Sequence, residues 1–222
     1  CKKERFDVKT ESYSTPKYKI KNGQFFIINE DDKVALKVFG KHNMQNLNGA
    51  KTLLARIGIT DDQFYEAIGS FEGTQKRNNL LAKNDSVSVY EDFAHAPSKL
   101  KATVNALKEL HPERKLTACF ELHTFSSLNK AFLKHYKNTY NSPETAIVFV
   151  NKKNLSQKDL PEISQEEIRK NFHRDDILVI DDAEELSSLL SKKSWNNEDL
   201  IFMSSGNFDG LNIKTLAQTI IR

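Results

Sequence analysis

Several short segments hold polar side chains at places where a folded chain could use them for chemistry. The segment GKHNMQN places Asn43 and Asn46 in the first turns of an amphipathic stretch, where alanine or leucine would serve a helix better. Three further segments, EDFAHAPS, ELHTFSS and SSGNFDG, are rich in polar residues and glycine. Asparagine amides donate and accept hydrogen bonds, and carboxylate and imidazole groups can exchange protons. These segments are therefore the candidates for binding or catalysis.

Each segment also has an ordinary structural interpretation. Asn43 could be the N-cap of its helix, because an asparagine there accepts hydrogen bonds from backbone amides. Asp92 and His95 could belong to a strand-end turn that leads into the next helix. His123 could be a loop histidine without a chemical role, and we expect His111 to end a helix at the surface. Taken singly, none of these segments identifies a function.

The composition excludes several classes of protein. With 222 residues, of which 38% are hydrophobic and 28% charged, the chain can form one large domain or two small ones. A formal net charge of +3 does not favour a nucleic-acid or membrane partner. No stretch approaches the roughly 20 apolar residues of a membrane span, and the N-terminus lacks a signal-peptide pattern. We therefore expect a cytoplasmic protein with no nucleic-acid and no membrane partner.

The two cysteines and the first residue carry limited information. Cys119 lies in the apolar run LTACF, so we expect a buried thiol rather than a disulfide framework or a metal cluster. The chain begins at Cys1 rather than at methionine. We therefore expect it to be a piece of a longer protein.

The first seventy residues predict a small antiparallel sheet followed by two helices. Asn22 and Gly23 lie between two alternating runs, which is a strong signal for a β-hairpin. Apolar residues from Met44 to Ile57 recur at spacings of three and four, and Gly58 ends that helix. A second helix begins at TDDQ, which has the spacing of a capping box, and runs to about Gly69.

From about Phe71, apolar strands alternate with amphipathic helices, which implies right-handed crossovers. The expected strands are SVSVYEDF, KLTACFEL, TAIVFV, DILVIDD and DLIFMSS. The expected helices are Ser98 to Leu110, Ser126 to about Lys137, Ser164 to Phe172, Ala183 to Lys192 and a last one from about Leu211. We predict an α/β chain: a Rossmann-like, mostly parallel sheet with flanking helices over 71–222, preceded by a small β-meander plus two helices over 1–70.

The polar segments follow particular strands of this predicted sheet. In an open parallel sheet, ligands bind outside the carboxyl ends of the strands. EDFAHAPS, ELHTFSS and SSGNFDG follow the first, second and last predicted strands, so we expect them to converge on one edge. The segments VNKKNLSQKDLPE and DDAEE follow the other two strands and are interpreted as solvated loops.

The order of these segments resembles the Mur ligase family from Val38 to the end of the chain. The HNxxN pattern is typical of the family, and DFAHAP matches its D-[FY]-A-H-x-P motif. Within the family, ELHTFSSLNK and MSSGNFDG look most like the murein peptide ligase branch, which joins a recycled tripeptide to UDP-N-acetylmuramate. The resemblance implies that residues 1–70 are the C-terminal part of the central ATP-binding domain and residues 71–222 the C-terminal, amino-substrate domain.

The resemblance also implies roles for individual residues. The asparagines of the motif, Asn43 and Asn46, would meet the adenine of ATP. Arg77 and Asp92 would reach the nucleotide from the other side, through phosphate oxygens and ribose hydroxyls. The residues expected near the incoming amine substrate are His95, His123, Ser205, Gly206 and Asn207. Because a strand-end carboxylate has little packing role, Asp92→Ala is expected to lower activity far more than stability.

The reaction implied by the resemblance is ATP-dependent amide-bond formation. ATP phosphorylates the muramyl carboxylate, and the amine of the peptide attacks the acyl phosphate, releasing ADP and phosphate. The implied cofactors are ATP and Mg²⁺, and the partners are ATP, UDP-N-acetylmuramate and the tripeptide L-Ala-γ-D-Glu-meso-diaminopimelate. No G-x-x-x-x-G-K-[ST] segment occurs here, so the phosphate loop and the metal ligands are expected upstream. The chain alone is expected to be inactive.

Two departures from other family members bear on the substrate. Alanine-adding members have a histidine–arginine pair and a further arginine after the second strand, where this sequence has HTFSS with Thr124 and Ser127. The D-N-P-R motif of diaminopimelate-adding members is also absent. A tripeptide substrate fits both departures. The alternatives are the UDP-N-acetylmuramate–L-alanine ligase of the biosynthetic pathway, a non-catalytic nucleotide- or peptide-binding module, and a structural domain in which the candidate residues would scatter.

Overall fold

A computed structural model describes residues 10–29 and 32–222. The chain forms two compact units, one up to residue 37 and from 41 to 71, and one of residues 38–40 and 72–222. No helix in the described part of the chain combines the length and the apolar character needed to span a bilayer. Each unit has its own core, and each is described separately below.

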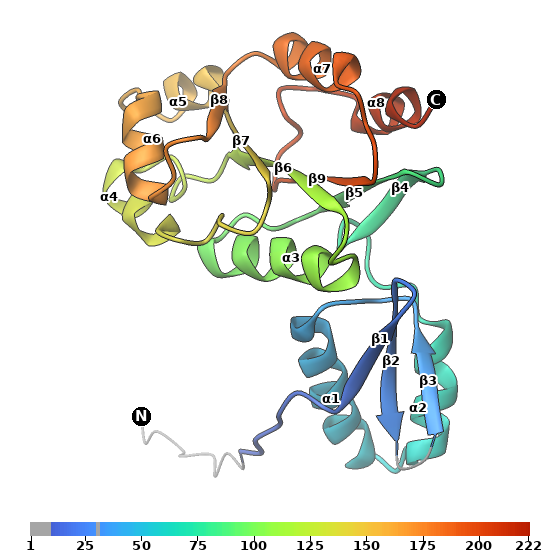
Figure 1. The fold of residues 1–222 in the computed structure, drawn as a ribbon. Coiled ribbons are helices and arrows are strands. Elements are labelled where there is room, and N and C mark those ends of the chain that lie inside the picture. Colours follow the sequence, from blue (N-terminus) through green and yellow to red (C-terminus); the bar gives the residue numbers. More distant parts are fainter. Residues whose placement is uncertain (1–9, 30–31) are drawn as a thin grey trace, which may run out of the picture. The chain divides into compact units, whose positions relative to one another are not determined.

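The smaller unit contains an antiparallel sheet of three strands in the order β1-β2-β3 (Figure 1). Its strands are β1 (Tyr18–Lys21), β2 (Gln24–Asn29) and β3 (Asp32–Leu36). Asn22 and Gly23 connect β1 and β2 with φ of 52° and 69°, which confirms the predicted two-residue hairpin. Phe25, Ile27 and Leu36 are buried and form the inner face of this sheet.

Two helices, α1 (Lys41–Ala55) and α2 (Asp61–Ser70), follow the sheet. Met44 is fully buried, as its place on the apolar stripe predicted. Ile57 was expected on the same stripe, but it lies beyond the helix end and is 73% exposed. The reason is the turn at Gly58, whose φ of +90° ends the helix. At the start of α2, Thr60 and Gln63 form the predicted capping box.

The larger unit contains a six-stranded sheet in the order β4-β5-β9-β6-β7-β8. Its strands are β4 (Asn79–Lys83), β5 (Val87–Asp92), β6 (Lys115–Leu122), β7 (Thr145–Val150), β8 (Leu178–Ile180) and β9 (Glu198–Met203). Neighbouring strands are parallel except for β4, which pairs antiparallel with β5 at the edge. The mostly parallel α/β sheet was predicted, but β4 was not, because its polar flanks were interpreted as a loop.

Helices cover both faces of this sheet. They are α3 (Pro97–Leu110), α4 (Lys130–Leu133), the 3-10 helix η1 (Lys134–Tyr136), α5 (Lys152–Gln157), α6 (Gln165–Phe172), α7 (Ala183–Lys192) and α8 (Ile213–Ile220). Figure 1 shows α3 on one side and α7 and α8 on the other. One buried cluster joins Leu186 of α7 and Leu216 of α8 to Cys119, Phe149 and Phe202 of the strands. Cys119 is fully buried, as predicted, and burial raises the pKa of its thiol.

Two segments differ from the predicted helices and loops. The helix expected from Ser126 to about Lys137 begins only at Lys130, because Thr124 and Ser127 form a hydroxyl-bonded turn and Asn129 caps α4. The segment after β7 was interpreted as a solvated loop, but it contains α5. Both differences lie next to the carboxyl ends of the strands, where the candidate residues are.

Candidate functional site

The ends of β5, β6 and β9 meet at one edge of the larger unit. The backbone N–H of Ser204, just after β9, donates to the carbonyl of Asp92 at the end of β5, over 3.0 Å. Gly206 lies directly against the ring of His123, which follows β6. A pocket of about 210 Å³ at this edge is lined by residues that include Lys76, Asp92, Ser204, Gly206 and Asn207. The structure therefore brings together the polar segments that follow the first, second and last main strands.

Asp92 is an integral part of this edge. It is 5% exposed, and its carboxylate accepts hydrogen bonds from the N–H of Asn78 (2.8 Å), the N–H of Ala94 (2.7 Å) and the hydroxyl of Thr103 (3.3 Å). The Asp92 carboxylate therefore has a packing role, contrary to the expectation from its place at the strand end. A strand-end acid that anchors two backbone segments contributes to folding as well as to any contact with a ligand.

The segment before β4 is held in a strained conformation beside Asp92. Lys76 and Asn78 have φ of 54° and 48°, in the left-handed region that non-glycine residues rarely occupy. The carbonyl of Lys76 accepts from the N–H of Phe93 at 2.7 Å, which fixes the segment to the end of β5. Arg77 is exposed, and its guanidinium lies over the Phe93 ring, 5.5 Å from the ring centroid. Lys76 lines the pocket, so this segment adds a cation to the edge.

Glu121 is a site residue that the sequence analysis missed. It is the next-to-last residue of β6 and is 1% exposed. One carboxylate oxygen, Oε2, accepts from the Ser204 hydroxyl and from the N–H of Phe208 (3.0 Å). The other oxygen, Oε1, lies 3.4 Å from His123 Nδ1 and accepts no hydrogen bond from the described residues. The only sequence signal was one acid inside the apolar strand KLTACFEL.

The loop after β9 depends on close packing and on unusual backbone angles. A Cβ at Gly206 would lie 2.4 Å from His123 Nδ1, so glycine is required for this approach. Phe208, Asp209 and Gly210 have φ of 52°, 57° and 87°. Buried aromatic contacts of Phe208 with Phe149 and Phe202 hold this conformation. The Ser205 hydroxyl is buried, and among the described residues it has no hydrogen-bond partner.

The segment after β7 also reaches this edge, contrary to its interpretation as a solvated loop. The ammonium group of Lys158 donates to the carbonyl of His123 at 2.6 Å. Asn151, at the end of β7, and Lys153 of α5 both bind the carboxylate of Asp209. A fourth strand end is therefore linked to the same two loops that carry His123 and Gly206.

His95 lies in the turn between β5 and α3. Its Nδ1 donates to the carbonyl of Phe93 at 2.9 Å, and its own carbonyl accepts from the hydroxyl of Tyr136 at 3.1 Å. α3 begins at Pro97, one residue before the expected start at Ser98. The imidazole is thus oriented by its own turn, and the structure gives it a defined position at the end of β5.

Asn43 and Asn46 belong to the smaller unit. Asn43 is the third residue of α1, so it is not the N-cap of this helix. Asn46 is exposed and lines an open hollow of about 990 Å³ together with Tyr13, Gly49 and Arg56. Residues 10–29 and 32–222 contain no group of three or more histidine, cysteine or acidic side chains placed to hold a metal ion.

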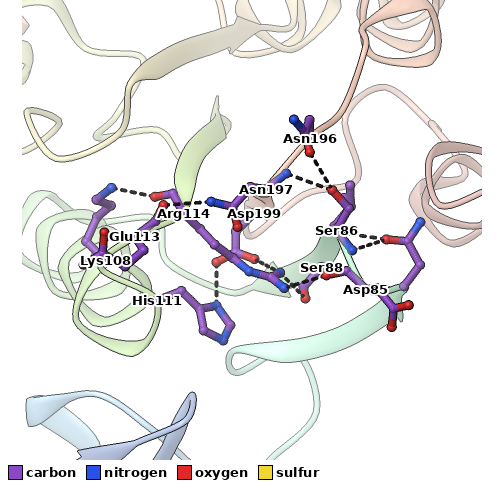
Figure 2. Close-up of polar contacts among 12 residues, drawn as sticks. Asp85, Ser86, Ser88, Lys108, His111, Glu113, Arg114, Asn196, Asn197 and Asp199 are labelled. Atoms are coloured by element: carbon purple, nitrogen blue, oxygen red, sulfur yellow. Dashed lines mark hydrogen bonds and ion pairs between the residues drawn. The ribbon is translucent and has the colours of Figure 1, made fainter.

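A second polar cluster lies at the amino ends of the strands (Figure 2). It includes His111, which was expected to be a surface residue but binds a buried carboxylate. Asp199 of β9 is 2% exposed and accepts from His111 Nδ1 at 2.6 Å and from Arg114 at 3.1 Å. Arg114 also donates to the hydroxyl of Ser88 in β5. Figure 2 shows these side chains converging from β5, β9 and the turn after α3, which stabilises the sheet at the edge away from the candidate site.

Comparison with known protein families identifies the family to which this chain belongs. Residues 76–206 match the family described as Mur ligase, glutamate ligase domain, which is more than half of the chain. The chain belongs to the Mur ligase family. A curated relative from Agathobacter rectalis, a UDP-N-acetylmuramate–L-alanine ligase, is 28% identical over 181 residues, which cover 78% of this chain and 38% of the relative. The chain spans less than half the length of the curated relatives it matches.

Solved structures of Mur ligases share the fold. UDP-N-acetylmuramate-alanine ligase from Thermotoga maritima matches with a TM-score of 0.69 at 16% identity, over 96% of this chain and 46% of that one. A murein peptide ligase from Psychrobacter arcticus matches with a TM-score of 0.60 at 18% identity, over 90% and 42%. A MurF ligase from Thermotoga maritima in complex with ADP matches with a TM-score of 0.62 at 17% identity, over 92% and 44%.

Proposed function

We propose that this chain is the C-terminal portion of an ATP-dependent ligase that joins L-Ala-γ-D-Glu-meso-diaminopimelate to UDP-N-acetylmuramate in peptidoglycan recycling. Membership of the Mur ligase family supports amide-bond formation as the reaction class. The observation that carries the proposal is the meeting of His123, Gly206 and Asp92 at one edge of the sheet. Any parallel sheet brings its strand ends to one edge, so the support comes from the polar residues found there and from the close packing of His123 on Gly206.

We further propose a division of labour between the two parts of the chain. Residues 1–70 would form the end of the ATP-binding domain, where Asn43 and Asn46 contact adenine. Residues 71–222 would carry the amine substrate, with Arg77 and Asp92 reaching the nucleotide. The ADP complex of the MurF ligase supports a nucleotide in proteins of this fold. Mg²⁺ and its ligands would come from another part of the complete protein, because the described residues offer no such cluster.

The residues of this chain would act by positioning the amine substrate and by neutralising the negative charge of the phosphate groups. The guanidinium of Arg77 is exposed and can pair with phosphate oxygens. Lys76 adds a second cation at the pocket beside Asp92. His95, His123 and the loop of Ser205, Gly206 and Asn207 would hold the amine of the incoming peptide. Holding an amine beside an acyl phosphate removes most of the entropic cost of the encounter, which is the main contribution such a domain can make.

The loop after β6 supports a peptide rather than alanine as the amine substrate. Thr124 and Ser127 occupy the positions of the arginines in alanine-adding family members, and they bond to each other at 3.0 Å in a compact turn. This turn carries no cation to bind the carboxylate of a single amino acid. Phe125 in the same turn is 60% exposed and could lie along a longer substrate.

One observation favours a second candidate function. Curated relatives that match the chain are UDP-N-acetylmuramate–L-alanine ligases, including one from Caldicellulosiruptor saccharolyticus at 34% identity over 63% of this chain. The complete protein could therefore add L-alanine. We prefer the tripeptide because the turn of Thr124 and Ser127 lacks the arginines that this reaction uses in the family.

The proposal is tested by phosphate release from the complete protein that carries this chain. ATP, Mg²⁺, UDP-N-acetylmuramate and the tripeptide are supplied together, and each is then omitted in turn. We expect phosphate release that requires all the components and a product with the mass of the amide. Phosphate release that does not depend on an amine, or no release with any amine, would contradict a ligase function.

A further inference from the structure

Glu121 connects the two loops of the candidate site through its two oxygens. Oε2 is fully used, because it accepts from the Ser204 hydroxyl and from the N–H of Phe208 at 3.0 Å. Oε1 is buried from solvent, accepts no hydrogen bond from the described residues and lies 3.4 Å from His123 Nδ1. A buried carboxylate oxygen without a donor is costly, so its position beside an imidazole needs an explanation.

The ring of His123 is closely packed on the side that faces Gly206. Gly206 packs against the ring so closely that any added Cβ would lie 2.4 Å from Nδ1. The N–H of Gly206 donates to the hydroxyl of Ser204, which itself donates to Glu121. Glu121, Ser204, Gly206 and His123 thus form one packed unit that spans the ends of β6 and β9.

We propose that Glu121 is a positioning residue that fixes the tautomer of His123, with the proton on Nδ1 facing Oε1 and the lone pair on Nε2. A carboxylate can only accept a hydrogen bond, so at 3.4 Å a protonated Nδ1 is favoured over a bare one. This inference rests on the proposed function in one respect, namely that His123 faces the incoming amine.

The tautomer decides what His123 can do for an amine. The substrate amine arrives as an ammonium ion and must lose a proton before its lone pair can attack an acyl phosphate. With the lone pair on Nε2, His123 accepts that proton and becomes an imidazolium, while the substrate becomes a neutral amine. The anionic carboxylate of Glu121 then stabilises the imidazolium through Nδ1–H. The opposite tautomer would present an N–H to the ammonium ion and could not accept its proton.

A purely structural role for Glu121 makes a different prediction, and Glu121→Gln separates the two. The amide oxygen of glutamine can still accept from Ser204 and Phe208, so the loop after β9 stays attached. The amide nitrogen then occupies the place of Oε1 and donates to Nδ1, which forces the proton of His123 onto Nε2. The substitution therefore keeps the structural tie and reverses the tautomer.

The first arm of the test is NMR of the 222-residue chain, which needs no activity. Long-range ¹H–¹⁵N spectra of the imidazoles distinguish protonated from bare nitrogens, and His123→Gln assigns the signals of His123. We expect the wild-type ring to carry its proton on Nδ1 and the E121Q ring to carry it on Nε2. A wild-type ring protonated on Nε2, or a tautomer unchanged by E121Q, would overturn the inference.

The second arm is steady-state kinetics of the complete protein. We expect E121Q to lower kcat/KM for the amine substrate by about 10- to 100-fold, the range found when the orienting partner of a metal-bound histidine is removed, with KM for ATP unchanged. The matched control is Glu198→Gln, which neutralises a buried acid at the opposite end of β9 that binds Thr117 and Lys193. An E121Q enzyme as active as wild type, despite a switched tautomer, would contradict the positioning role.

The two arms also separate this inference from the proposed function. If the complete protein ligates no amine, the proposed function fails, and the NMR arm still decides whether Glu121 fixes the tautomer. If the ligase is active but the tautomer is the opposite one, only the present inference fails.

Discussion

The ring of His123 lies against the backbone of Gly206, so close that a Cβ at Gly206 would be 2.4 Å from Nδ1 and 2.7 Å from Cγ. Contacts of this kind are not tolerated, so Gly206→Ala must displace the histidine or the loop after β9. We expect a loss of about 1–3 kcal/mol in the free energy of unfolding, together with a large loss of activity. The fluorescence of Trp195, the single tryptophan, reports unfolding of the larger unit.

Gly210→Ala is the matched control in the same loop. Gly210 has φ of +87°, and no atom lies within 4 Å of an added Cβ. The substitution therefore carries only the backbone cost of the left-handed region, about 1 kcal/mol, and leaves His123 in place. Equal activity losses in the two variants would show that the contact between Gly206 and His123 is not what matters.

Asp92→Ala is predicted to destabilise the larger unit as well as to lower activity. The substitution leaves the buried donors of Asn78 and Ala94 without an acceptor, so we expect a loss of about 3 kcal/mol. Thr103→Val removes only the hydroxyl that donates to the same carboxylate, and should cost about 1 kcal/mol. Denaturant unfolding followed by Trp195 fluorescence measures both. An Asp92→Ala variant as stable as wild type would show that these hydrogen bonds contribute nothing net.

Glu144 is predicted to make stability depend on pH at the acidic end. Burial opposes ionisation, but the ammonium of Lys108 and the N–H of Leu116 outweigh it and hold the pKa of Glu144 below its ordinary value. A lowered folded pKa gives stability that is present above the unfolded pKa, about 4.3, and is lost as pH falls through the folded pKa. Glu144→Gln should therefore be less stable than wild type at pH 7, with the difference vanishing at lower pH.

Exposed Glu162 provides the control for this experiment. Glu162→Gln should leave stability within about 0.5 kcal/mol of wild type throughout the same pH range, because the side chain is at the surface. If the difference between wild type and Glu144→Gln were the same at pH 3 and pH 7, the assignment to the ionised carboxylate would be wrong.

Asn46→Ala is predicted to change stability and nucleotide affinity in opposite directions. Asn46 is exposed in the middle of α1, where alanine is the better helix former by about 0.5 kcal/mol. The variant should thus be slightly more stable, while the complete protein should bind ATP about 10-fold more weakly if the amide meets adenine. Gln45→Ala, also exposed on α1, should leave ATP affinity unchanged. Unaltered affinity in Asn46→Ala would remove this residue from the nucleotide site.

Local signals predicted most of the fold. The hairpin at Asn22 and Gly23 and the capping box at Thr60 follow from backbone preferences and hydrogen bonds within a few residues, so the sequence alone indicates them. The edge strand β4 was missed because its identity depends on pairing with β5, which contributes the hydrogen bonds. Likewise, α4 starts late because the hydroxyls of Thr124 and Ser127 compete locally with helix formation.

Part of the site could be predicted from the topology of the sheet. The rule that parallel strands present their carboxyl ends at one edge places His123 and Gly206 together without further information. By contrast, the pairing of Glu121 with Ser204 and of His111 with Asp199 joins residues 83 and 88 positions apart. No local pattern encodes such partners, and a single acid in an apolar strand indicates only that a partner must exist.

The choice of amine by the complete protein tests the central proposal most directly. With ATP, Mg²⁺ and UDP-N-acetylmuramate, equal concentrations of L-Ala-γ-D-Glu-meso-diaminopimelate and L-alanine are supplied in one reaction, and the products are separated by mass. We predict that the tripeptide adduct forms and that the alanine adduct does not. An alanine adduct as the main product would contradict the account and place the enzyme with the alanine-adding ligases.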